Sequence, residues 1–127
     1  MIVLDTSVAI AALTGHRAAH EAVARQRLGA PHLIDVEIAH ALRGLVLGGR
    51  IAASDAETVL DGWERLAIDR VAHAPLVRRI WELREDLTAS DAAFVAVAEV
   101  HGVALLTADR RLATAPGPRC AIELFPL

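Results

Sequence analysis

Five short apolar runs, separated by stretches of helical periodicity, constrain this chain more than any other feature of its sequence. We predict strands at residues 2–4, 32–34, 66–68, 103–106 and 121–124. We predict helical segments at residues 6–13, 17–27, 35–47, 54–63, 75–84, 90–100 and 109–112. Short apolar strands that alternate with helices are typical of a parallel sheet covered on both faces. The pattern therefore predicts an α/β protein, a three-layer α/β/α fold with a central, mainly parallel five-stranded sheet.

Composition narrows the class of protein further. The length of 127 residues suits a single domain over residues 1–127, and a hydrophobic content of 54% excludes intrinsic disorder. The single cysteine, Cys120, excludes a disulfide framework and a cysteine-rich zinc site, and it indicates a reducing compartment. No apolar run approaches the roughly 20 residues of a membrane span, and residues 1–13 lack a basic leader, so we expect a cytoplasmic protein without a membrane partner.

Capping residues predict where several helices begin. Asp35 is expected to cap the helix over residues 35–47, and Ser54 with Glu57 matches a capping box at the start of the next helix. Residues 90–100 are apolar on almost every side, which predicts a buried helix.

Four acidic residues fall near the edge of the predicted sheet at which open α/β proteins bind ligands: Asp5, Glu37, Asp91 and Asp109. Asp5 directly follows the first strand, while Glu37 and Asp109 each lie three residues after a predicted strand. Asp91 opens the buried helix. Each acid alone is explained as a helix cap, a first-turn acid or a turn residue. Four acids at one edge favour a shared site.

Carboxylates that converge in a partly dry site repel one another unless they share a proton or bind a divalent cation. An all-oxygen site without cysteine or paired histidine favours Mg²⁺ or Mn²⁺ over zinc. Mg²⁺ held by few carboxylates keeps several waters and recruits substrate phosphates. These donors therefore point to phosphodiester cleavage by a metal-activated water.

Four segments of the chain together resemble the PIN domain, and more closely the VapC-type toxins of toxin–antitoxin pairs: IVLDTS at 2–7, the helix of Glu37, LTASDAAFVAVAE at 87–99 and LLTADR at 105–110. The resemblance covers essentially the whole chain. It implies a PIN-like fold and a Mg²⁺- or Mn²⁺-dependent endoribonuclease acting on RNA. It also implies a homodimer that is inhibited by a cognate VapB-type antitoxin.

The resemblance also implies roles for individual residues. In the family, the metal site is formed by the acids that match Asp5, Glu37, Asp91 and Asp109. The expected supporting or substrate-binding residues are Thr6, Ser7, Thr107 and Arg110.

Two positions depart from the family pattern, in which Asn often stands at Asp86 and an aromatic residue at Ser90. Asp86 adds a fifth carboxylate near the site, which we expect to face solvent. All four core acids are present, so the chain is expected to be active.

For several residues, the sequence allows more than one role. Arg110 and Arg111 follow Asp109, and contact with a substrate phosphate and a solvated surface are both consistent with that position. His16 and His20 are spaced like a helical metal pair, but no third ligand is nearby, so a surface pair is expected. Trp63 and Trp81 are expected in the core or in a dimer interface.

Other functions remain as alternatives or are excluded. All 13 basic residues are arginine, and this absence of lysine excludes receiver domains and haloacid-dehalogenase-type phosphatases. No glycine-rich loop follows a strand, which excludes a P-loop or dinucleotide site. A PIN nuclease outside a toxin–antitoxin system and a non-catalytic interaction module, whose acids are all helix caps, stay open.

The net charge of −3 by itself argues against a polyanionic partner. Two divalent cations at the four acids would turn that charge into +1, and arginine side chains suit phosphate. The acidic total therefore does not exclude RNA.

Overall fold

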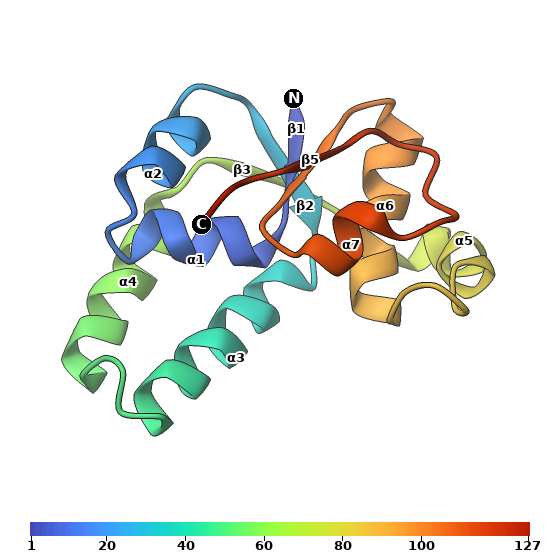
Figure 1. Ribbon diagram of the computed structural model, residues 1–127. Coiled ribbons are helices and arrows are strands. Elements are labelled where there is room, and N and C mark those ends of the chain that lie inside the picture. Colours follow the sequence, from blue (N-terminus) through green and yellow to red (C-terminus); the bar gives the residue numbers. More distant parts are fainter.

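The computed structural model describes residues 1–127 and contains one sheet (Figure 1). Its strands are β1 (Ile2–Leu4), β2 (Leu28–Pro31), β3 (Ile68–Val71), β4 (Leu105–Thr107) and β5 (Ile122–Leu124). Its helices are α1 (Thr6–Leu13), α2 (Arg17–Ala24), α3 (Ile34–Leu47), α4 (Ala53–Arg65), α5 (Val77–Glu82), α6 (Ala89–His101) and α7 (Arg110–Thr114), with a 3-10 turn η1 (Ala74–Leu76).

The five strands lie in the order β3-β2-β1-β4-β5, and every neighbouring pair is parallel. The predicted α/β fold is confirmed, with a sheet that is wholly parallel. The carboxyl ends of all strands therefore meet at one edge, toward the bottom of Figure 1. The chain leaves β1 toward β2 on one side and returns to β4 on the other, which makes the β1–β4 junction the switch point where such sheets bind ligands.

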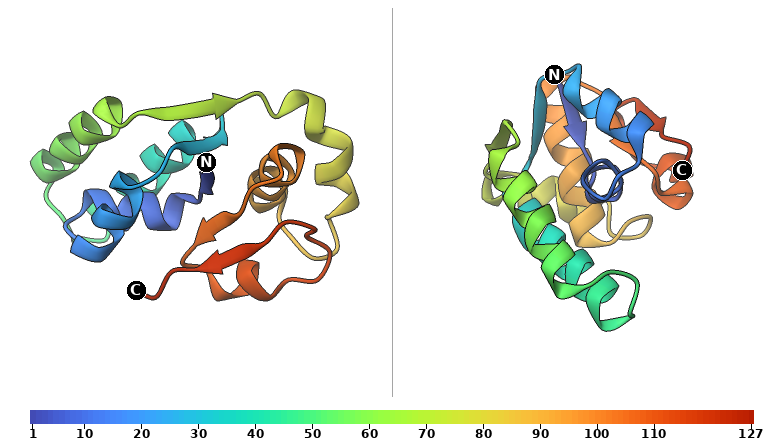
Figure 2. Two further views of the ribbon diagram at one scale, coloured as in Figure 1. Left: turned by 90° about the horizontal axis from the view of Figure 1, so that it is seen from above. Right: turned by 90° about the vertical axis from the view of Figure 1, so that its left-hand side faces the viewer.

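Helices cover both faces of the sheet. Figure 2 shows α1 and α6 on opposite sides of the strands. Helix α6 contacts β1, β2 and β4, whereas α1 contacts β4 and packs on α2 and α3. The α3–α4 pair projects beyond the carboxyl edge (Figure 1), so the first turn of α3 lies next to the ends of β1 and β4.

Helix α6 is the centre of the core. Seven consecutive residues, from Ala92 to Ala98, are buried, which confirms the predicted buried helix. Small alanines let α6 approach the sheet closely, while Phe94, Val95 and Val97 fill the space between them. Gly102 ends the helix in the left-handed conformation, with φ of 63°, which glycine adopts without a steric cost.

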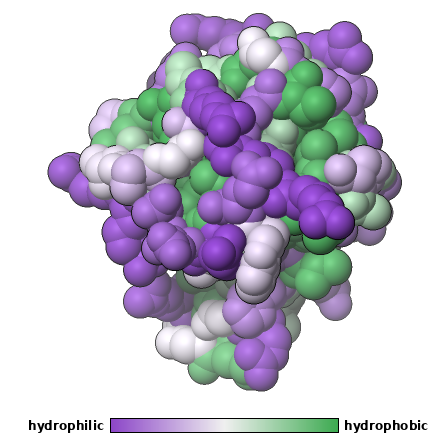
Figure 3. All heavy atoms as spheres, turned by 90° about the vertical axis from the view of Figure 1, so that its right-hand side faces the viewer, coloured by the Kyte–Doolittle hydropathy of each residue, from purple (hydrophilic) through white to green (hydrophobic).

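The two predicted tryptophan positions differ in burial. Trp63 is in the core, whereas Trp81 on α5 is 66% exposed. Hydrophobic and hydrophilic side chains are interspersed on the side of the molecule that carries α5 (Figure 3). None of the helices has the length and apolar character needed to cross a membrane.

The second strand lies at Leu28–Pro31, so its prediction at residues 32–34 is wrong by four residues. The LGAP sequence carries turn-forming residues rather than a β-branched run, yet it is buried because strands pair on both its sides. A Cβ at Gly29 would lie 3.0 Å from the Met1 sulfur, so this tight packing favours glycine there. The third strand also begins later than predicted, because its exposed Asp69 and Arg70 interrupt the apolar pattern.

Two predicted caps are also wrong. Helix α3 begins at Ile34, and the Asp35 carboxylate instead accepts hydrogen bonds from Trp63 and Arg70. Helix α4 begins at Ala53, and no side chain caps it. Asp35 lies inside the first turn of α3 and Asp55 inside that of α4, where the helix N-terminus favours negative charge without a cap.

Candidate metal centre

The four predicted acids come from four different elements and lie at the carboxyl edge of the sheet. Asp5 directly follows β1, and Asp109 lies two residues after the end of β4. Glu37 is in the first turn of α3, and Asp91 is in the first turn of α6. The charge of Asp5 acts on both Glu37 and Asp91, and the charge of Asp109 acts on Asp91. The fold thus brings these acids within electrostatic reach of one another.

Asp5 is buried and held by two hydroxyl groups. Ser7 Oγ donates to Asp5 Oδ2 at 2.6 Å, and the fully buried Thr107 Oγ1 donates to the same oxygen at 2.7 Å. The same hydroxyl oxygens accept hydrogen bonds from the backbone amides of Ala108, at 3.0 Å, and Asp109, at 3.1 Å. This network joins the ends of β1 and β4. Asp5 occupies the N-cap position of α1, but its side chain makes no capping hydrogen bond.

Glu37 is half-buried and only partly satisfied. Thr6 Oγ1 donates to Glu37 Oε2 at 3.1 Å, while Oε1 is buried and has no hydrogen-bond partner. Burial raises the pKa of Glu37, and the charges of Asp5 and Asp91 raise it further against the opposing hydrogen bond from Thr6. An unpaired buried carboxylate oxygen is costly unless it binds a proton or a cation.

Asp91 borders a small pocket beside the acids. The pocket has a volume of about 130 Å³ and is lined by Asp86, Leu87, Thr88, Asp91, Arg111 and Leu112. Burial raises the pKa of Asp91, as does the charge of Asp5, while the hydrogen bond with Thr88 and the charge of Arg111 oppose the shift. Thr88 Oγ1 accepts from the Asp91 amide at 3.2 Å and so caps this helix.

The donor set fits a hydrated hard cation. Its side chains offer only carboxylate and hydroxyl oxygens, and the orphaned Glu37 Oε1 is an oxygen that a cation would satisfy. No three of the acids stand close enough together to form a complete cage. Mg²⁺ does not need such a cage, because it binds through one or two carboxylates and keeps several waters.

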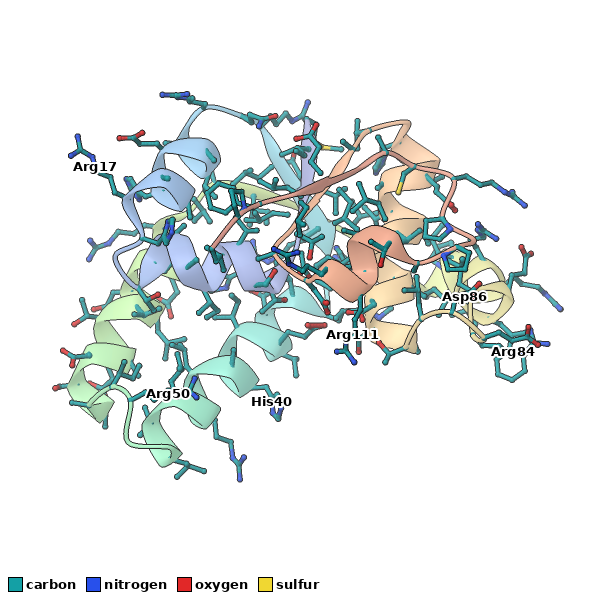
Figure 4. All side chains as sticks on the ribbon, viewed as in Figure 1. Arg17, His40, Arg50, Arg84, Asp86 and Arg111 are labelled. Carbon is teal, nitrogen blue, oxygen red and sulfur yellow. The ribbon has the colours of Figure 1, made fainter.

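The other predicted residues lie around the acids. Thr6, Ser7 and Thr107 all join the hydrogen-bond network described above. Arg110 is exposed on α7, and Asp109 caps that helix by accepting from the Arg111 amide at 2.9 Å. Figure 4 shows Arg111 below α7, between the start of α3 and the first turn of α6.

The structure also places four further residues: Asp86, His16, His20 and His40. Asp86 is exposed at the pocket wall, which agrees with the expectation that it faces solvent. His16 and His20 are exposed, and His16 Nδ1 caps α2 by accepting from the Ala19 amide. His40 was not predicted, yet its charge lowers the pKa of Glu37. Its position one helical turn after Glu37 is the signal that identifies it.

The PIN domain family model matches residues 2–118 of this chain. The chain belongs to the PIN domain family. This PIN domain is 44% identical over 126 residues to a VapC ribonuclease of Mycobacterium bovis, and the match covers 99% of both chains. The predicted membership of the VapC-type PIN domains is therefore confirmed.

Solved structures share the fold of this PIN domain. A protein from Pyrobaculum aerophilum has a TM-score of 0.68 and 26% identity, with 95% of this chain and 81% of that chain covered. A toxin–antitoxin complex from Klebsiella pneumoniae has a TM-score of 0.66 and 19% identity, with 92% and 94% covered. The second likeness concerns the fold alone.

Proposed function

We propose that this PIN domain is a metal-dependent endoribonuclease toxin of the VapC type, neutralised by a cognate VapB-type antitoxin. The observation that carries the proposal is the 44% identity to a VapC ribonuclease along nearly the whole chain. The toxin cleaves phosphodiester bonds of RNA in the cytoplasm. It acts as a homodimer in which residues 1–127 of each chain form a single domain.

In this proposal, Asp5, Glu37, Asp91 and Asp109 would together hold a hydrated Mg²⁺ or Mn²⁺, with one or two of the carboxylates binding the ion directly and the others reaching its waters. Bound by these acids, the cation would supply a water of lowered pKa and would stabilise negative charge on the phosphate. Support comes from the oxygen-only donor set and from the unsatisfied Glu37 Oε1.

The remaining residues of the site orient these acids. Ser7 and Thr107 hold Asp5 Oδ2, and no hydrogen bond in the protein uses Oδ1, so that oxygen stays free for a cation. Thr6 holds Glu37 Oε2. Arg110, exposed directly after Asp109, belongs to the proposed RNA-binding surface.

The interaction-module alternative explains fewer of the acids. Asp109 does cap α7, and Thr88 caps the helix that carries Asp91. Asp5 makes no capping hydrogen bond, and Glu37 leaves a buried oxygen unpaired, which helix capping does not account for.

Cleavage assays test the proposal. We expect the purified protein to cleave RNA with Mg²⁺ or Mn²⁺ and to stop when a chelator is added. Asp5→Asn and Asp91→Asn are expected to abolish cleavage while circular dichroism shows an intact fold. Asp61→Asn, on the exposed face of α4, is the matched control and is expected to keep full activity. Wild-type cleavage rates in both site variants would refute the metal site.

Assembly is tested separately. Sedimentation is expected to give about twice the chain mass of 13.5 kDa for the free protein. Co-expression with the product of an adjacent small reading frame is expected to yield a complex that does not cleave RNA. A monomer at micromolar concentration would contradict the homodimer.

A further inference from the structure

The pocket beside Asp91 has an uneven charge distribution. Its two acids, Asp86 and Asp91, come from the α5–α6 loop and the first turn of α6. Its single cation, Arg111, comes from α7. The pocket therefore presents one positive group next to the candidate metal ligands.

The Arg111 guanidinium is free to bind a ligand. Its side chain is 92% exposed and donates no hydrogen bond within the protein; Nε lies 3.8 Å from Asp109 Oδ1. Two other arginines are fully engaged by comparison. Arg79 binds Glu99 through two nitrogens, and Arg70 binds both oxygens of Asp35. Exposure alone does not set Arg111 apart, but exposure at the wall of this pocket does.

The neighbouring Arg110 has a different position. It is exposed on the same helix, but it does not line the pocket and makes no ion pair. Successive residues of an α-helix point about 100° apart, because there are 3.6 residues per turn. The two arginines are thus adjacent in sequence, but only Arg111 borders the pocket.

We propose that Arg111 binds a phosphate of the RNA backbone over this pocket, next to the phosphodiester bond that is cleaved. The inference rests on the proposed ribonuclease function and names the residue that places RNA against the acids. A planar guanidinium donates two parallel hydrogen bonds to phosphate oxygens, a geometry that a lysine ammonium does not reproduce. The weak 3.8 Å contact with Asp109 is readily exchanged for such a ligand.

RNA binding, measured apart from cleavage, tests the inference. The probe is a short fluorescein-labelled single-stranded RNA, with Ca²⁺ as the cation and a gel to verify that the RNA stays intact. We expect Arg111→Ala to weaken RNA binding about tenfold. We also expect the slope of log Kd against log salt concentration to fall by about 0.7, as for one lost phosphate contact. Arg111→Lys is expected to recover part of the affinity and the full salt dependence.

Arg25→Ala is the matched control, since it removes the same charge. Arg25 is exposed at the end of α2 and precedes the amino end of β2, so it lies at the opposite edge of the sheet. We expect the RNA affinity of Arg25→Ala to stay within twofold of that of the wild type. Arg110→Ala is expected to lose less affinity than Arg111→Ala, because Arg110 does not border the pocket.

The outcomes separate the inference from the function on which it rests. Wild-type affinity and salt dependence in Arg111→Ala, or an equal or larger loss in Arg110→Ala, would overturn the role of Arg111 while leaving the ribonuclease proposal intact. An equal loss in Arg25→Ala would reduce the effect to net charge and also overturn it. A wild-type protein that binds no RNA would overturn both.

Discussion

Thr107 connects two of the proposed metal ligands through one buried hydroxyl. It donates to Asp5 Oδ2 and accepts from the Asp109 amide, and its side chain is fully buried. Thr107→Val keeps the shape but leaves the Asp109 amide without its acceptor and removes one of the two hydroxyl donors to Asp5 Oδ2, so we expect a loss of roughly 1–3 kcal/mol in the free energy of unfolding, measured with urea. Thr58→Val, an exposed threonine on α4, is the control and is expected to change it little. Equal stability of the two variants would contradict the network.

A substitution of Glu37, unlike one of Thr107, is expected to stabilise the metal-free protein. Its pKa is raised by burial, Asp5 and Asp91, so its ionisation opposes folding once the pH rises above its ordinary value of 4.5. We expect Glu37→Gln to stabilise the metal-free protein at pH 7 and to lose this advantage near pH 4. Urea midpoints at the two pH values measure the effect.

Adding Mg²⁺ tests whether the stability change in Glu37→Gln comes from the lost charge or from altered packing. A cation that binds only the folded state stabilises it by mass action, so Mg²⁺ is expected to raise the urea midpoint of the wild type more than that of Glu37→Gln. Glu57→Gln, on the exposed face of α4, is the matched control with little expected change. A destabilised Glu37→Gln at pH 7 without metal would contradict the expectation that burial of the Glu37 charge, with the added repulsion by Asp5 and Asp91, opposes folding.

At the scale of elements, one ion pair ties α5, α6 and the loop before β5 together. Arg79 donates to both oxygens of Glu99, at 2.7 and 3.0 Å, and to the Gly117 carbonyl at 2.9 Å. The Arg119 amide also donates to Glu99, at 2.7 Å. Burial alone would raise the pKa of Glu99, but the hydrogen bonds from Arg79 and Arg119 hold it below its usual value.

The sign of this shift gives a pH prediction. A lowered pKa in the folded state contributes stability above the ordinary value of 4.5, and this contribution is lost as the pH falls through the folded value. Glu99→Gln is therefore expected to cost roughly 1.5–3 kcal/mol at pH 7 and less below pH 4. Glu21→Gln, which breaks the exposed Arg17–Glu21 pair, is expected to cost under about 0.5 kcal/mol. If the difference in free energy of unfolding between the wild type and Glu99→Gln did not change with pH, this explanation would be contradicted.

Elements also differ in how well their sequence predicts them. Strand β1, residues 105–106 of β4 and residues 92–98 of α6 are apolar and buried, so hydrophobic patterning alone locates these elements. Strands β2 and β3 were misplaced, because the first contains glycine and proline and the second has an exposed polar centre. Both are held by pairing with neighbouring strands, which no local pattern reports.

At the scale of the whole molecule, charge couples the metal to RNA. The net charge of −3 includes the four acids of the proposed site. Bound divalent cations cancel that repulsion, so we expect chelation to weaken RNA binding several-fold as well as to stop cleavage. Anisotropy at matched ionic strength, with and without cation, measures this effect. Equal affinity in both conditions would show that the acids do not face the bound RNA.

The sequence by itself determined the class of fold, the sheet edge that carries the acids and the family resemblance. These follow from local patterns, since hydrophobic periodicity and the residue after each strand do not depend on distant contacts. Only the tertiary structure decided how the acids are held. The hydroxyl of Thr107 reaches Asp5 across 102 positions of sequence, and Thr6 reaches Glu37 across 31. Packing between elements brings these distant residues together. It also places Arg111, rather than Arg110, at the pocket. Local sequence patterns do not report such packing.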